Sequence, residues 1–88
     1  MLLKDKLSLV TGAARGLGEA IARRMAAEGA HVLVVDRDLE PAQRVAASIR
    51  AAGGRADADS VDVGDAAAVD ALAARIAAAH GDIDVLVN

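Results

Sequence analysis

The chain has 88 residues and a net charge of −3, with no cysteine, phenylalanine, tyrosine or tryptophan. This length supports one small domain, and the lack of cysteine excludes disulfides and thiolate metal sites. The small acidic excess argues against a nucleic-acid or anionic-membrane surface, and no apolar run approaches the roughly 20 residues of a membrane helix. The N-terminal residues do not resemble a signal peptide. We therefore expect a cytoplasmic protein with neither nucleic-acid nor membrane partners.

The first third of the chain predicts a strand, a glycine-rich turn and a helix. Residues 6–11 are predicted to form the strand, because they contain the apolar run Leu7-Ser8-Leu9-Val10, which is typical of a central strand covered on both faces. Helical periodicity follows over residues 16–28. Leu17, Ile21 and Met25 are spaced four apart and are expected to form its core face.

The middle of the chain predicts a second strand and a second helix. Residues 32–35 are β-branched or leucine and end at Asp36. The helix that follows has Pro41 in its first turn, where a missing N–H group costs nothing. Gly53 and Gly54 end this helix. Its predicted core face consists of Ala42, Val45, Ile49 and Ala52.

The last third predicts a weak strand, a third helix and a fourth strand. Residues 56–63 alternate small and acidic side chains, as expected near a sheet edge. Asp65 is a suitable N-cap for a helix that ends at His80, and residues 83–87 form another apolar run. The predicted core face of the third helix consists of Val69, Leu72, Ala73 and Ile76.

This order, β-α-β-α-β-α-β, predicts an α/β fold. Strands joined by helical crossovers run parallel and connect with a right hand. We expect a Rossmann-type doubly wound parallel sheet of strand order 3-2-1-4, in which residues 1–88 form the N-terminal part of a single, incomplete domain. The first two helices are expected on one face and the third nearly alone on the other. The fourth strand then presents an apolar edge that favours association.

The segment Thr11–Gly18 carries the strongest functional signal. Glycines in a turn from a strand into a helix bring a phosphate group close to backbone N–H groups at the positive end of the helix dipole. The spacing Gly-x-x-x-Gly-x-Gly lacks the Gly-Lys-Ser/Thr ending of a P-loop, which argues against triphosphate hydrolysis. The alternative is a glycine-rich turn without a ligand. The residues predicted to contact a diphosphate are Gly12, Arg15, Gly16, Leu17 and Gly18.

Asp36 closes the second strand where an acid accepts hydrogen bonds from the ribose of a dinucleotide. Its charge would also repel a 2′-phosphate, which favours NAD over NADP. Arg37 is a second candidate contact, because an arginine at this point can receive that phosphate. Asp62 and Val63 are predicted to meet the adenine. The alternatives are a capping role for Asp36 and a plain surface role for Asp62.

No metal site is expected from the sequence. The four aspartates after the second helix lack the glycine and the closing glutamate of a calcium loop. His31 and His80 have no evident partner base or nucleophile, and are expected to be surface or capping residues. These four aspartates are Asp57, Asp59, Asp62 and Asp65.

Together these motifs resemble the short-chain dehydrogenase/reductase family. Residues 11–18 match its T-G-x-x-x-G-x-G motif, and Asp62-Val63 matches its adenine-side pair. Residues 83–88 are similar to the strand that leads into its N-N-A-G motif. The resemblance implies an oxidoreductase that transfers hydride between NAD(H) and a carbonyl or secondary alcohol, in a homo-oligomer. This chain would supply the adenosine and diphosphate half of the cofactor site.

The resemblance is incomplete, because the sequence stops at Asn88, the first asparagine of N-N-A-G. The family's catalytic serine and its Tyr-x-x-x-Lys pair have no counterpart, so we expect no catalytic residue among these 88. Two alternatives remain open: a non-catalytic nucleotide-binding module, and a fragment that completes a sheet with a partner chain.

Overall fold

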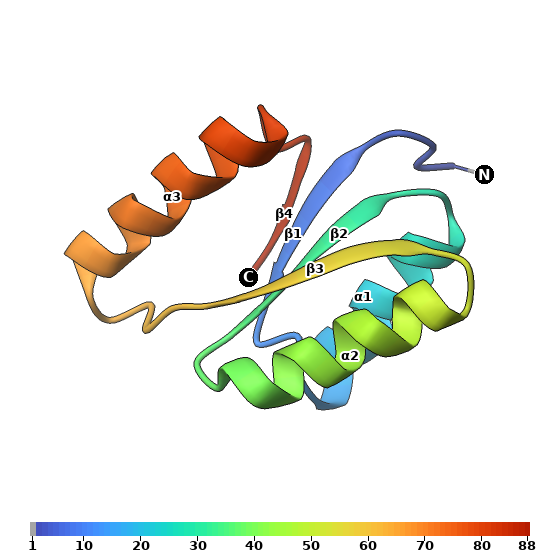
Figure 1. Ribbon diagram of the computed structural model, residues 1–88, viewed down its shortest axis with the longest axis horizontal. Coiled ribbons are helices and arrows are strands. Elements are labelled where there is room, and N and C mark those ends of the chain that lie inside the picture. The colour runs from blue at the N-terminus through green and yellow to red at the C-terminus, as the bar shows by residue number, and fades with distance from the viewer. Residues whose placement is uncertain (1) are drawn as a thin grey trace.

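The computed structural model describes residues 2–88 and contains one four-stranded parallel sheet of order β3-β2-β1-β4 (Figure 1). This arrangement confirms the predicted fold class and strand order. The elements in chain order are β1 (Leu7–Thr11), α1 (Gly16–Ala27), β2 (His31–Asp36), α2 (Leu39–Ala51), β3 (Arg55–Ser60), α3 (Ala66–His80) and β4 (Val85–Val87).

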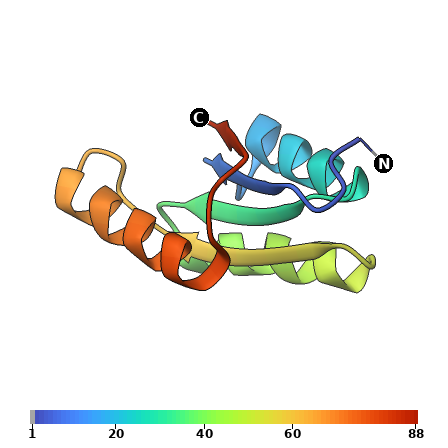
Figure 2. The same ribbon diagram turned by 90° about the horizontal axis from the view of Figure 1, so that it is seen from above.

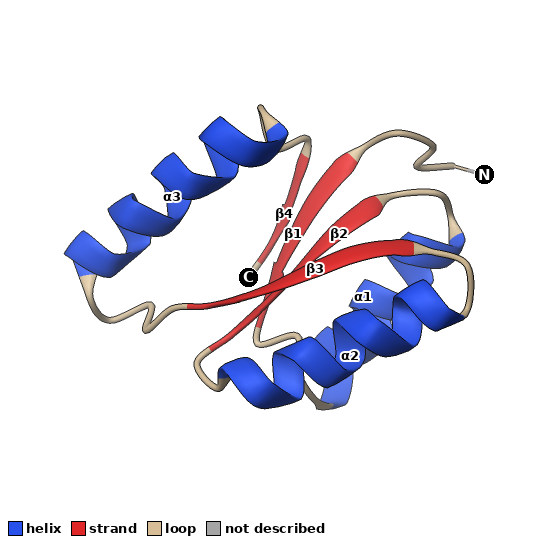
Figure 3. Cartoon of the chain, viewed as in Figure 1, coloured by secondary structure: helices blue, strands red, loops and turns tan. Residues whose placement is uncertain are grey.

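Helices cover the two faces of the sheet unequally. α1 and α2 lie together on one face and α3 lies alone on the other, as predicted (Figures 2 and 3). The strands alternate their side chains between the faces, because successive residues of a strand point in opposite directions. β1 therefore sends Val10 toward α1 and α2, and Leu7 and Leu9 toward α3.

The core under α1 and α2 is built from valine and alanine. Val10, Val32 and Val34 are fully buried in the strands, and Ala22 is fully buried in α1. Small side chains let the helices approach the sheet closely, which allows a core to be filled without aromatic residues. α2 contributes Ala42, Val45, Ala46 and Ile49.

Two residues expected in this core are exposed. Leu17 is 77% exposed, whereas Ile21 and Met25 of the same predicted stripe do pack against the core. α1 returns antiparallel to the strands, so its first turn lies at the edge where they end and no sheet remains to cover Leu17. Ala52 is also exposed, because it lies one residue beyond the end of α2.

α3 packs through a narrow stripe. Leu72 and Ile76 are its buried residues, whereas Val69 and Ala73, also predicted in the core, are exposed. Two apolar residues four apart define a contact that is one side chain wide, and neighbouring positions then face solvent. Asp65 caps the helix as predicted, since its carboxylate accepts a hydrogen bond from the Ala68 N–H at 3.1 Å.

β4 is shorter than the predicted 83–87. Asp84 lies just before it and bonds twice to Leu7: its N–H donates to the Leu7 carbonyl and its carboxylate accepts from the Leu7 N–H, both at 2.8 Å. The side chain thus takes the place of a ladder carbonyl. Leu86 in β4 is exposed, which agrees with an apolar edge.

None of the helices in residues 2–88 combines the length and the apolar character that crossing a membrane requires.

Ser8 in β1 leads to a stability prediction. It is fully buried, and within residues 2–88 its hydroxyl has no hydrogen-bond partner. An unsatisfied buried hydroxyl costs about 1–3 kcal/mol, so we expect Ser8→Ala to leave the free energy of unfolding unchanged or to raise it by about 1 kcal/mol. Urea unfolding monitored by circular dichroism measures this. Ser48→Ala is the control, since the Ser48 hydroxyl does bond to Arg23 at 2.9 Å. A clear loss of stability in Ser8→Ala would contradict the prediction.

Candidate functional site

The loops at the carboxyl ends of the strands bring the predicted site residues to one edge of the sheet. The β1–α1 loop, the end of β2 and the loop after β3 all open there, and the strand order reverses between β1 and β4. Ligands of doubly wound sheets bind at such a reversal. A hollow of about 370 Å³ lies at this edge. It is lined by Thr11, Gly12, Val35, Asp36, Arg37, Val61, Asp62, Val63 and Asn88.

A larger hollow of about 500 Å³ lies at the opposite end of the strands, near the ends of α1 and α2. Its lining includes charged residues of both signs, but it has no helix N-terminus and no glycine motif. We therefore choose the candidate site by the convergence of polar groups at the carboxyl edge and not by the size of the hollow.

The glycines of the β1–α1 loop have different structural roles. Gly12 and Gly16 have φ of 60° and 58°, a conformation that other residues adopt only with strain. A Cβ built on either one meets nothing within 4 Å, so the space beside the loop is open. A Cβ on Gly18 would instead overlap the Gly12 carbonyl, with the carbonyl carbon at 2.8 Å. Gly18 thus permits close packing of α1 on the loop.

The loop divides its N–H groups between the fold and the exterior. Ala13 and Ala14 are buried; the Ala13 N–H donates to the Val35 carbonyl and the Ala14 N–H to the Asp36 carboxylate, both at 3.1 Å. The first backbone hydrogen bond of α1 runs from Glu19 to Arg15. The N–H groups ahead of Glu19 in α1 have no acceptor one turn earlier in the helix, and residues 15–17 are exposed. This end of α1 can therefore bind an anion.

Asp36 is held in place by the backbone. Its carboxylate accepts hydrogen bonds from the N–H groups of Ala14 at 3.1 Å and Asp38 at 3.2 Å, one on each oxygen. Burial raises the pKa of Asp36, but these two bonds and the nearby Arg15 charge outweigh it, so the pKa lies below the ordinary 3.8. The carboxylate is therefore ionised at neutral pH. Each oxygen keeps capacity to accept a further bond from a ligand hydroxyl.

Two arginines flank this carboxylate in exposed ion pairs. Arg15 pairs with Asp38 at 3.1 Å, and Arg37 pairs with Asp62 at 3.5 Å. Exposed pairs of this kind contribute little to stability, so both guanidinium groups can turn toward a ligand. Arg37, which is adjacent to Asp36 in the sequence, thus reaches the loop after β3.

Asp62 and Val63 lie on the lining of the 370 Å³ hollow. Asp62 also accepts a hydrogen bond from the Gly64 N–H at 2.9 Å, which shapes the turn into α3. Val63 is 67% exposed, so its apolar side chain is free to contact a flat ligand surface. The functional and the structural interpretation of Asp62 are therefore compatible.

Some contacts were not predicted from the sequence. Thr11 at the end of β1 donates its hydroxyl proton to Asn88 Oδ1 at 3.0 Å, which places both side chains at the site. His31 and His80 were expected to lack a partner, and this prediction is wrong: His31 hydrogen-bonds Asp57 at 2.7 Å, and the two imidazole rings lie 5.0 Å apart. The position of Thr11 at the end of a predicted strand could have indicated its contact with Asn88. No local sequence signal indicated the grouping of His31, Asp57 and His80.

Comparison with known proteins identifies the family. The model of the short chain dehydrogenase family matches residues 6–88. The chain belongs to this family. Its fold, glycine loop and strand order are therefore those of a short-chain dehydrogenase, as the resemblance implied.

Relatives and solved structures agree on this membership. The chain is 45% identical over 86 residues to 2,3-dihydro-2,3-dihydroxybenzoate dehydrogenase of Bacillus subtilis, covering 98% of this chain and 33% of the relative. It is 44% identical to meso-2,3-butanediol dehydrogenase of Serratia marcescens, covering 100% and 34%. A solved metagenomic short-chain oxidoreductase in complex with NADP has a TM-score of 0.94 at 42% identity, covering 98% and 39%. The chain thus spans about a third of the length of these curated relatives.

The close approach at Gly18 predicts that this short-chain dehydrogenase segment does not tolerate alanine there. In Gly18→Ala the new methyl group meets backbone atoms of Gly12, which cannot move aside as a side chain would. We expect a loss of about 1–3 kcal/mol in the free energy of unfolding. Gly16→Asn is the control, because asparagine accepts a positive φ and the space there is open. Denaturant unfolding of both variants measures the difference, and wild-type stability in Gly18→Ala would refute the packing argument.

The lowered pKa of Asp36 predicts a specific response to acid. A carboxyl group whose pKa is lower in the folded state stabilises the fold above its unfolded pKa, and this contribution disappears as the pH falls through the folded value. The wild-type free energy of unfolding should therefore fall as the pH drops below about 4, whereas Asp36→Asn should show a flatter acid limb. Urea titrations between neutral and acidic pH test this, with Asp70→Asn on exposed α3 as the control. Parallel pH profiles for wild type and Asp36→Asn would contradict it.

Proposed function

We propose that residues 1–88 form the N-terminal part of a single dinucleotide-binding domain in an NAD(P)-dependent oxidoreductase. The observation that carries this proposal is that one edge of the sheet holds both the exposed N-terminus of α1, whose first N–H groups have no acceptor within the helix, and the fixed, ionised Asp36. Gly12, in the loop that leads into α1, lines the same hollow as Asp36. Membership of the short-chain dehydrogenase family supports it. When bound, the nicotinamide cofactor would supply hydride chemistry between NAD(H) and a carbonyl or secondary alcohol.

The residues present fit the adenosine and diphosphate half of such a cofactor. The open space over Gly12 and Gly16 admits a diphosphate to the N–H groups at the start of α1. Arg15 adds a mobile positive charge beside it. Asp36 retains acceptor capacity for two ribose hydroxyls. Asp62 and Val63 line the same hollow as Asp36 and would contact the adenine, Asp62 at its edge and Val63 against its ring.

We further propose that NAD is preferred over NADP. The Asp36 carboxylate is ionised and cannot turn away, because two backbone N–H groups hold it. Its repulsion of a 2′-phosphate amounts to about 1–4 kcal/mol at close range, depending on the effective dielectric. Arg37 works in the opposite direction, but it is paired with Asp62. The complex of the metagenomic relative with NADP belongs to that protein and leaves the preference to be tested here.

In the family, proton transfer depends on a Tyr-x-x-x-Lys pair, and residues 1–88 contain no tyrosine. The residues that transfer the proton would therefore lie outside residues 1–88. The substrate and an assembly into homo-oligomers would likewise depend on other parts of the protein. Of the two alternatives, a nucleotide-binding module predicts the same binding without turnover, and a sheet-completing fragment predicts no nucleotide binding.

Calorimetric titration of the protein with NAD⁺, NADP⁺ and AMP tests these proposals. We expect NAD⁺ and AMP to bind, and NADP⁺ to bind at least about fivefold more weakly than NAD⁺. Asp36→Asn should narrow this difference, because the charge is removed while the hydrogen bonds to ribose are partly retained. Glu40→Gln is the matched control, since this exposed residue in the first turn of α2 loses the same charge.

Each outcome points to a different conclusion. Tighter binding of NADP⁺ than NAD⁺ would overturn the proposed preference while leaving the site in place. The absence of binding by all three nucleotides would overturn the dinucleotide site itself and favour the sheet-completing fragment.

A further inference from the structure

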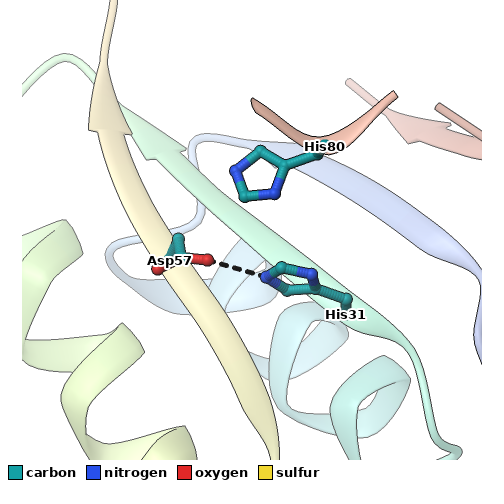
Figure 4. A group of neighbouring side chains, drawn as sticks. All are labelled: His31, Asp57 and His80. Carbon is teal, nitrogen blue, oxygen red and sulfur yellow. Dashed lines mark hydrogen bonds and ion pairs between the residues drawn. The ribbon is translucent and has the colours of Figure 1, made fainter. Parts of the chain in front are cut away.

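Three side chains from separate elements meet on the α3 face of the sheet (Figure 4). His31 is the first residue of β2, Asp57 lies in β3 and His80 is the last residue of α3. His31 Nε2 lies 2.7 Å from Asp57 Oδ2, and the ring of His80 stands edge-on to that of His31 at 86°. One ring nitrogen of each histidine and a carboxylate oxygen of Asp57 all lie within 4.8 Å of one another.

The sheet register and the helix period bring these residues together. Leu33 of β2 pairs with Asp57 of β3, so Asp57 shares the sheet face of Leu33 and of His31, two residues earlier. On α3, the buried residues Leu72 and Ile76 continue at the same spacing of four to His80. His80 therefore lies on the same side of α3 as Leu72 and Ile76, the side that packs on the strands.

We propose that His31, Asp57 and His80 bind a divalent transition-metal ion, for which Zn²⁺ is the best match. Two imidazoles and one carboxylate are typical ligands for Zn²⁺ and are poor ligands for the hard ion Mg²⁺. With metal–ligand bonds of 2.0–2.1 Å, tetrahedral geometry places ligand atoms about 3.3 Å apart. The present separations, 2.7 Å between His31 and Asp57 and at most 4.8 Å for the pairs that include His80, are compatible with that value after small side-chain movements.

The surroundings permit the small movements that this geometry requires. Asp57 and His80 are exposed and His31 is half-buried, so rotation about their side-chain bonds meets little resistance. Zn²⁺ would displace the proton of the His31–Asp57 hydrogen bond, and this proton would move to His31 Nδ1 or to solvent. Two arginines on this face are already paired, which offsets their charges: Arg75 with Asp59 at 3.1 Å, and Arg55, which lies opposite His31 in the sheet, with Asp5 at 3.3 Å.

A metal ion at this point would fasten α3 to β2 and β3. The helix buries only a narrow apolar stripe, and the Arg75–Asp59 pair is largely exposed. The cluster also lies toward the amino end of β2, away from the β1–α1 loop at the opposite edge. The proposed metal site is therefore independent of dinucleotide binding, and the role of the metal ion would be structural.

Zn²⁺ titration of the untagged protein, in full length where it extends beyond residue 88, tests the proposal by calorimetry. We expect one Zn²⁺ per chain with a Kd in the micromolar range, no uptake of Mg²⁺, and a rise in Tm of roughly 3 °C or more at Zn²⁺ concentrations ten times Kd. His80→Gln and Asp57→Asn should each weaken binding at least about tenfold. Asp70→Asn is the control, because it removes one charge from α3 away from the cluster.

Co²⁺ substitution provides a readout that does not depend on the variants. Visible absorption typical of nitrogen and oxygen ligands in a four- or five-coordinate site is expected for wild type, and Zn²⁺ should abolish it. The proposal is overturned if wild type takes up no Zn²⁺ saturably, or if folded His80→Gln binds Zn²⁺ as tightly as wild type. If His80→Gln does not fold, a wild-type Co²⁺ spectrum identical to that of the ion in buffer overturns it as well.

Discussion

The close approach of α1 to the end of β1 determines the geometry of the whole carboxyl edge of the sheet. Gly18 lies against the Gly12 carbonyl at a distance that excludes any side chain, so the helix starts directly over the loop. The bonds from Ala13 to Val35 and from Ala14 to Asp36 then fasten the same loop to β2. The helix N-terminus and the carboxylate are consequently fixed relative to each other before any ligand arrives, which reduces the ordering cost of binding.

The two faces of the sheet are stabilised in different ways. Under α1 and α2 the core is continuous, and its largest fully buried apolar side chains are valines of the two central strands, β1 and β2. On the other face α3 is attached through Leu72 and Ile76, through the Arg75–Asp59 pair and through the contacts of His80. Segments with few buried apolar contacts open at lower free energy than the core. We therefore infer that α3 detaches before the other helices do.

The sequence was sufficient to predict the fold because its signals are local. Runs of leucine and valine define β1 and β2, and Asp65 marks the start of α3 through a bond within its own turn. The failures have a common physical origin in tertiary position. The periodicity that includes Leu17 is genuine, but it carries no information on where the sheet ends. Similarly, spacing alone did not reveal that α3 contacts the sheet too narrowly to bury Val69.

The candidate site was predicted to the extent that it depends on one turn and its flanking residues. The glycine loop and Asp36 follow from strand ends that the topology places side by side. The grouping of His31 with Asp57 and His80 depends instead on the register between β2 and β3 and on the tilt of α3, neither of which is encoded in adjacent residues. The pairing of Thr11 with Asn88 similarly requires that β4 lie beside β1.

The charges at the carboxyl edge differ in mobility, and this difference bears on recognition. Arg15 and Arg37 are long, exposed and held only by weak pairs, so either can move to meet a phosphate at little cost. Asp36 is short, partly buried and bonded to the backbone through both oxygens. In the proposed complex the mobile arginines would adjust their positions to the phosphate groups of the ligand. The fixed Asp36 carboxylate would instead accept hydrogen bonds from ribose hydroxyls and repel a 2′-phosphate. Discrimination at the ribose would therefore depend on Asp36, and the arginines would contribute chiefly to overall affinity.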